Sequence, residues 1–147
     1  MENTERKYFD DAMCDYADVY DGDKPLMIVS SGKSALAYET VAMLAERSNL
    51  NLVLKVLRCE DGFLHEHALV SSKSFGKGVD YSLAASRLLD EAKAGEINRG
   101  ELQYYLGRML GYELADIFEF MGSAVARNCP CDCCGGAFVP ESYFDSE

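Results

Sequence analysis

The sequence has no run of apolar residues long enough to cross a lipid bilayer. Its N-terminus also lacks the basic end and the apolar centre of a secretory signal. These two absences predict a cytoplasmic protein. Because disulfides are rare in a reducing compartment, the six cysteines need an explanation other than a disulfide framework.

Recognisable catalytic motifs are missing as well. The sequence contains no nucleophile elbow, no dinucleotide-binding fingerprint and no metalloprotease motif. Only two histidines are present, so acid–base chemistry by imidazole is restricted to one point of the chain. The sequence therefore favours a non-enzymatic protein and identifies no catalytic residue.

Basic residues are scarce, with 14 Lys and Arg against 25 Asp and Glu and a formal net charge of −11. Residues 1–23 and 101–147 each carry eight acidic and two basic residues, whereas residues 24–100 are nearly neutral. Such a negative field repels phosphate backbones and anionic lipid, which argues against direct binding of nucleic acid or a membrane. It favours a basic protein surface as the partner, or simply a well-solvated exterior.

The length of 147 residues and the hydrophobic content of 48% fit a single α+β domain. We expect a small sheet of two or three strands packed with about five helices. Four regions follow one another: an acidic amphipathic helix in 1–23, a strand/helix/strand core in 24–78, a helical region in 79–127, and a Cys-rich tail in 128–147. The helical region should end in a helical hairpin.

Local sequence patterns predict where the helices and strands begin and end. Apolar spacing predicts a first helix over about residues 4–20, and strands are expected at 26–29, 50–57 and 63–70, the last two joined as a hairpin. Asp80 can cap a helix that ends at Gly95. Gly111 allows a break between the two helices of the hairpin.

Acidic side chains recur on the solvent side of the predicted first and last helices. We expect them to steer and orient association with a basic partner, an effect strongest at low salt. One form of this hypothesis is a virally encoded inhibitor that occupies a nucleic-acid site. The predicted partner-binding residues are Asp11, Asp15 and Asp18 on the first helix and Glu113, Asp116 and Glu119 on the last.

The most reactive stretch is the Cys-rich tail, in which four thiols lie within six residues. Clustered thiolates are ligands for zinc. Adjacent Cys133 and Cys134 cannot easily bind one ion together. We therefore expect two or three tail thiols to bind the ion, with the remaining ligands supplied from elsewhere in the fold. The candidate ligands are Cys129, Cys131, Cys133 and Cys134 in the tail, with Cys14, Cys59, His65 and His67 outside it. Inert packing of the thiols and a redox role stay open as alternatives.

His65 and His67 share one face if they lie on a strand, because strand side chains alternate. A His-x-His pair can hold a metal ion together with a cysteine. Two exposed histidines in a hairpin would instead be ordinary surface residues.

Two loops rich in Ser, Gly and Lys suggest a second kind of site. Residues 30–34 stand between a predicted strand and a predicted helix, where backbone amides can bind phosphate. The end of this loop matches a P-loop, but Met27 occupies the position of the required first glycine. An enzyme or sensor for a nucleotide or small phosphate compound is thus the alternative function. Its anion-binding residues would be Lys33 and Ser34 in this loop, with Lys73 and Lys77 in residues 71–78.

Overall fold

A three-stranded antiparallel sheet forms the centre of the α+β fold, seen in a computed structural model that describes residues 3–58, 63–73, 79–97 and 99–117. Its strands are β1 (Leu26–Ser30), β2 (Asn51–Arg58) and β3 (Leu64–Ser71). The spatial order is β1-β3-β2, so the last strand in sequence lies between the other two. Because β3 is antiparallel to both neighbours, β1 and β2 run parallel as the two edges of the sheet.

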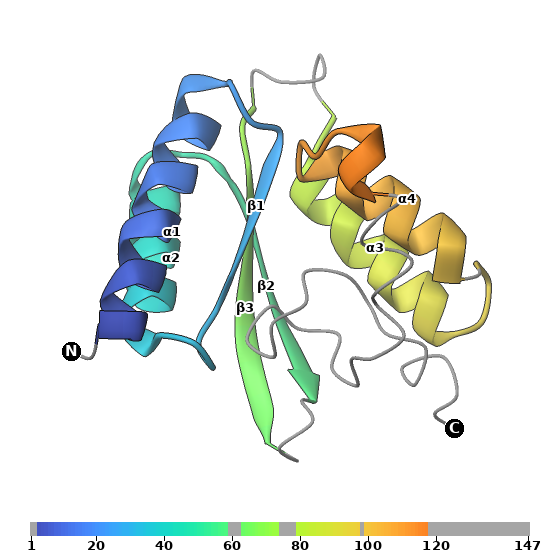
Figure 1. The fold of residues 1–147 in the computed structure, drawn as a ribbon, viewed down its shortest axis with the longest axis horizontal. Helices are drawn as coiled ribbons and strands as arrows, with labels where there is room; N and C mark the ends of the chain where they lie inside the picture. The colour runs from blue at the N-terminus through green and yellow to red at the C-terminus, as the bar shows by residue number, and fades with distance from the viewer. Residues whose placement is uncertain (1–2, 59–62, 74–78, 98, 118–147) are drawn as a thin grey trace.

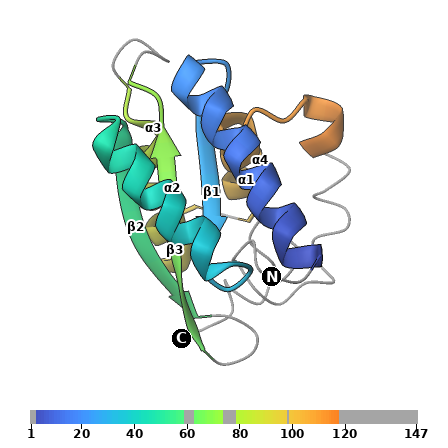
Figure 2. The same cartoon turned by 90° about the vertical axis from the view of Figure 1, so that its left-hand side faces the viewer.

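Helices cover both faces of this sheet (Figures 1 and 2). Helices α1 (Asn3–Asp21) and α2 (Ala35–Arg47) pack on one face, and α3 (Tyr81–Lys93) packs on the other with α4 (Arg99–Met109) beside it. A further helical segment begins at Leu114. Counting that segment, five helices occur among the described residues, in agreement with the predicted fold class. None of these described helices combines the length and the apolar character that a bilayer span requires.

Local sequence signals explain where several elements begin and end. The Ser34 hydroxyl accepts a hydrogen bond from the amide of Ala37 and so caps the start of α2. Asp80 caps α3 in the same way, as predicted. Gly95 and Gly111 adopt positive φ angles of 80° and 87° just beyond the ends of α3 and α4, a conformation that glycine adopts without strain.

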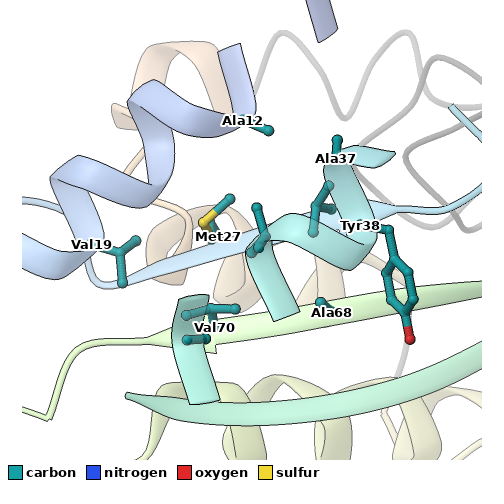
Figure 3. Packing of buried hydrophobic residues seen from close by; sticks show 10 residues of the cluster. Ala12, Val19, Met27, Ala37, Tyr38, Ala68 and Val70 are labelled. Carbon is teal, nitrogen blue, oxygen red and sulfur yellow. The ribbon is translucent and has the colours of Figure 1, made fainter. Parts of the chain in front are cut away.

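Alternation along the strands divides the interior into two apolar clusters. Met27, Val29, Ala68 and Val70 pack against α1 and α2 on one face, as Figure 3 shows for this cluster. The alternate strand positions face the other pair of helices. That second cluster joins Leu26 and Leu69 to Ala85 of α3, to Leu106 and Leu110 of α4, and to Ile117.

Not every apolar residue at helical spacing is buried. Tyr20, Tyr105 and Leu114 follow such spacing in the sequence but are exposed. The buried positions of α4 are Leu102, Gln103, Leu106 and Gly107, and Tyr105 is exposed beside them, with its ring edge-on to Tyr104. Most of the second helix of the predicted hairpin and the whole Cys-rich tail lie outside the described residues.

Candidate functional site

The imidazole of His67 is buried in the sheet face that packs against α3. Strand alternation places His65 and His67 on this same face, as predicted, and His67 pairs with Lys55 on β2. The His67 side chain is 1% exposed, and its Nδ1 lies 3.1 Å from the carbonyl oxygen of His65. A carbonyl oxygen accepts only, so Nδ1 carries the proton and Nε2 holds the lone pair. Nε2 has no hydrogen-bond partner among the described residues.

Burial lowers the pKa of His67 to about 4. The ring is therefore neutral at physiological pH. A neutral imidazole that donates Nδ1–H to a backbone carbonyl and presents a free Nε2 has the arrangement found in metal-ligating histidines. His67 thus has the chemistry expected of the ligand that its sequence context suggested.

The other predicted metal ligands are not brought to His67 by the part of the chain that the structure describes. Cys14 is exposed on α1, on the opposite side of the sheet, so it cannot complete a site with His67. Within the described ranges no group of three or more His, Cys, Asp and Glu residues could hold an ion. The remaining predicted cysteine ligands, Cys59, Cys129, Cys131, Cys133 and Cys134, lie outside those ranges.

The backbone amides of residues 31–34 already donate hydrogen bonds within the loop or to β3. The amide of Ser31 donates to the Glu66 carbonyl, and that of Gly32 donates to the Ser30 hydroxyl. The amides of Lys33 and Ser34 both point to the Ser30 carbonyl. Because a phosphate-binding loop must turn such amides toward its ligand, this geometry does not favour an anion cradle.

The lysines predicted to share an anion pocket do not lie together. Lys33 follows the end of β1, where Ser30 pairs with His67, and its ammonium stands 5.5 Å from the centre of the Tyr8 ring. Lys73 follows the end of β3, at the opposite end of the sheet, and donates to Asn49. Lys77 lies outside the described residues. A single pocket built from Lys33 and Lys73 is therefore excluded.

Two of the three acidic residues predicted on α1 are paired with the chain's own lysines. Asp11 forms an ion pair with Lys7 at 3.1 Å, and Asp15 forms one with Lys24 at 3.1 Å. No ion pair forms at Asp18 among the described residues, and its side chain is exposed. The predicted acidic stripe is thus partly paired with lysines along its length, and among the described residues Asp18 has no such ion pair.

That end of α1 lies close to the acidic segment that follows α4. The turn after α1 leads through Lys24 and Pro25 into β1, and Gly111 packs on this turn. A Cβ built on Gly111 would lie 3.6 Å from Cδ of Pro25. Ile117 shares an apolar cluster with Leu26, which holds the intervening residues at the same end of the molecule (Figure 1).

The segment that follows α1 and the segment that follows α4 therefore meet at this end of the fold. Five exposed acidic residues belong to the segments that meet here, and we refer to them as the acidic surface. Tyr112 and Leu114, 40% and 43% exposed, flank one of them. The acidic surface consists of Asp18, Asp21, Asp23, Glu113 and Asp116.

Sequence reasoning identified only part of this surface. Asp18, Glu113 and Asp116 were among the predicted partner-binding residues, whereas Asp21 and Asp23 were not. Their charge was the available signal, but their proximity to residues 113–116 depends on the packing of Gly111 on Pro25. Glu119 lies outside the described residues.

Comparison with known proteins gives no relative. No known protein family, curated protein or solved structure matches the chain.

Proposed function

We propose that this chain is a non-enzymatic binding protein that engages a basic surface of a protein partner through its acidic surface. The observation that carries the proposal is that exposed acidic residues from both acidic regions of the sequence lie on segments that meet at one end of the fold. Charges gathered on one side of a molecule orient an approaching partner of opposite sign far better than the same charges spread evenly.

The composition of the surface supports a protein partner. Exposed Tyr112 and Leu114 stand next to Glu113 and Asp116, and interfaces are enriched in tyrosine. An inhibitor that competes with nucleic acid for a basic site is one form that such binding can take.

A pair of charge-reversed variants tests the location of the binding surface. Asp18→Lys/Asp116→Lys alters the acidic surface, and Glu46→Lys/Glu91→Lys makes the same change in net charge at exposed positions on α2 and α3. Proteins captured from a cell lysate by the wild-type chain are identified, purified and titrated against all three chains by calorimetry. We expect at least a tenfold loss of affinity for the first variant and little change for the second.

Ionic strength gives an independent readout in the same titrations. Affinity for the wild-type chain should fall steadily as NaCl rises from about 50 to about 300 mM, because the Debye length shortens. Equal loss in both double variants, or an affinity that does not depend on salt, would contradict the proposal.

A zinc centre is the second candidate, favoured by the imidazole of His67. Its Nδ1–H···O=C hydrogen bond orients the ring, and its buried Nε2 has no partner among the described residues. Leaving a buried acceptor unpaired costs about 1–3 kcal/mol, so a ligand for Nε2 would stabilise the fold. We propose that thiolates of the Cys-rich tail complete this site.

Cobalt substitution tests the zinc site without any assay of activity. The full chain is stripped with a chelator, loaded with Co²⁺ and examined for thiolate-to-metal charge-transfer absorption. We expect His67→Ala to weaken metal affinity about 10- to 100-fold or more, and His65→Ala to change it little. If binding is lost in His65→Ala but kept in His67→Ala, His65 and not His67 is the ligand. If wild type shows no tetrahedral Co²⁺ spectrum, the proposed zinc site does not exist.

A further inference from the structure

Among the described residues, strand β2 forms an edge of the sheet and exposes apolar side chains along it. Leu54 and Val56 are 56% and 55% exposed, although they point to the face that α1 and α2 cover over the other strands. Leu64, at the start of β3, adds a third apolar side chain to the same face and is 58% exposed. Helix α2 thus leaves a strip of this face uncovered next to the edge (Figure 2).

Strand β2 has little of the usual protection of an edge strand, since its charged residues are Lys55 and, at its last position, Arg58. Natural edges are blocked by charged residues, proline or bulges. Pairing with β3 is continuous from Asn51 to Arg58, and the strand contains no proline. Its Lys55 points to the opposite face, where the ammonium binds Asp90 of α3 at 2.6 Å. The lysine is therefore held against α3 rather than left as a free charge on the edge.

We propose that β2 pairs antiparallel with β2 of a second copy of this chain, about a two-fold axis perpendicular to the sheet. This arrangement joins two three-stranded sheets into one of six strands. It keeps α1 and α2 of both copies on the same side. The exposed strips of the two copies then form one continuous apolar surface across the axis.

Side-chain chemistry selects the register. Centring the pair on Lys55 would place two ammonium groups directly opposite each other, which is unfavourable. Centring it on Leu54 places Leu54 against its own copy and Leu52 against Val56. On the other face, Lys55 then lies opposite Val53 and keeps its ion pair with Asp90.

Charge distribution favours a second copy at this edge. The acidic surface lies beside β1, the opposite edge of the sheet, and residues 24–100 are nearly neutral. Two copies joined at β2 therefore keep their most negative regions far apart. The inference does not depend on the proposed function, although such a dimer would present two acidic surfaces at its two ends.

The oligomeric state of edge variants tests the pairing. Light scattering coupled to gel filtration measures molar mass over a range of chain concentrations for wild type, Leu54→Lys and Met43→Lys. Met43 is an exposed apolar residue on α2 and serves as the matched control. We expect wild type and Met43→Lys to form dimers at high concentration, and Leu54→Lys to raise the dimer dissociation constant at least tenfold.

Amide hydrogen exchange separates edge pairing from association elsewhere. Protection of β2 amides should rise with concentration in the wild type and should not in Leu54→Lys, whose circular dichroism shows whether it is folded. Val56→Glu is a second variant if Leu54→Lys fails to fold. A wild-type monomer at all concentrations, or a dimer that both edge variants retain, would overturn the proposal.

Discussion

His67 is the residue at which burial and ionisation conflict most strongly. Burial lowers its folded-state pKa to about 4, whereas an unfolded histidine titrates near 6.5. Above pH 6.5 both states are neutral, and the contribution of His67 to stability is complete. As pH falls towards 4, only the unfolded state takes up the proton, so stability should decrease by up to about 3 kcal/mol.

Urea unfolding of chelator-treated protein between pH 7.5 and pH 4 measures this loss. Carboxylates titrate over part of the same range, so the difference between variants carries the information. His67→Leu should unfold with a weaker pH dependence, and His65→Leu should keep the wild-type dependence. Identical pH profiles for wild type and His67→Leu would show that the imidazole is not held neutral by the fold.

The sequence predicts the shared face of the two histidines but not their different environments. Period-two alternation is a local property of a strand, so residues 65 and 67 had to point the same way once β3 formed. The burial of His67 comes from its central position in the sheet, between Ser30 and Lys55. No local sequence pattern predicts which residues of β1 and β2 will lie beside His67.

At the scale of elements, the start of α3 is fixed by a small hydrogen-bond network. The Asp80 carboxylate accepts from the Leu83 amide at 3.0 Å and from the Ser82 hydroxyl at 2.5 Å. The hydroxyl of Ser71, the last residue of β3, accepts from the amide of Ser82. The cap therefore also ties the helix to the central strand.

Removing this cap should destabilise the fold measurably. We expect Asp80→Ala to lower the free energy of unfolding by about 1–2 kcal/mol, because the Leu83 amide and Ser82 lose their acceptor. Asp80→Asn keeps an acceptor oxygen and should recover most of that loss. Chemical denaturation provides the measurement, and Glu91→Ala, an exposed change on the same helix, is the control. A similar loss in Glu91→Ala would mean that helix propensity rather than capping is measured.

Element positions follow from local signals more completely than element order does. The third strand, the Asp80 cap and the break at Gly111 were all predicted, because turn chemistry and capping are read within a few residues. The insertion of β3 between β1 and β2 was not predicted. It depends on which strand edges are free when the hairpin docks, a choice made between segments far apart in the chain.

At the scale of the whole molecule, the fold concentrates charge that the sequence distributes to its two ends. The formal net charge is −11, and both acidic terminal regions contribute to the acidic surface. Composition predicted the excess of negative charge but not its convergence, because the contact of Gly111 with Pro25 joins residues far apart in sequence. Composition likewise could not show that Lys33 and Lys73, two of the predicted anion-binding residues, follow opposite ends of the sheet.

Gathering like charges on one surface should cost stability in the unbound protein. Raising NaCl from about 20 to about 300 mM shortens the Debye length from roughly 20 Å to roughly 6 Å, and it should stabilise the wild type by about 1 kcal/mol. Asp18→Lys/Asp116→Lys relieves the repulsion directly. This variant should therefore be more stable than wild type at low salt and should gain less from added salt.

Thermal unfolding of the three chains used for the binding test measures this effect. Glu46→Lys/Glu91→Lys alters net charge equally and should give a smaller stabilisation, because its positions lie outside the acidic surface. A gain in stability that accompanies a loss of partner binding would indicate that these carboxylates serve recognition at the expense of folding. If reversing them instead destabilises the protein at low salt, they act within the fold, and the binding role assigned to them must be given up.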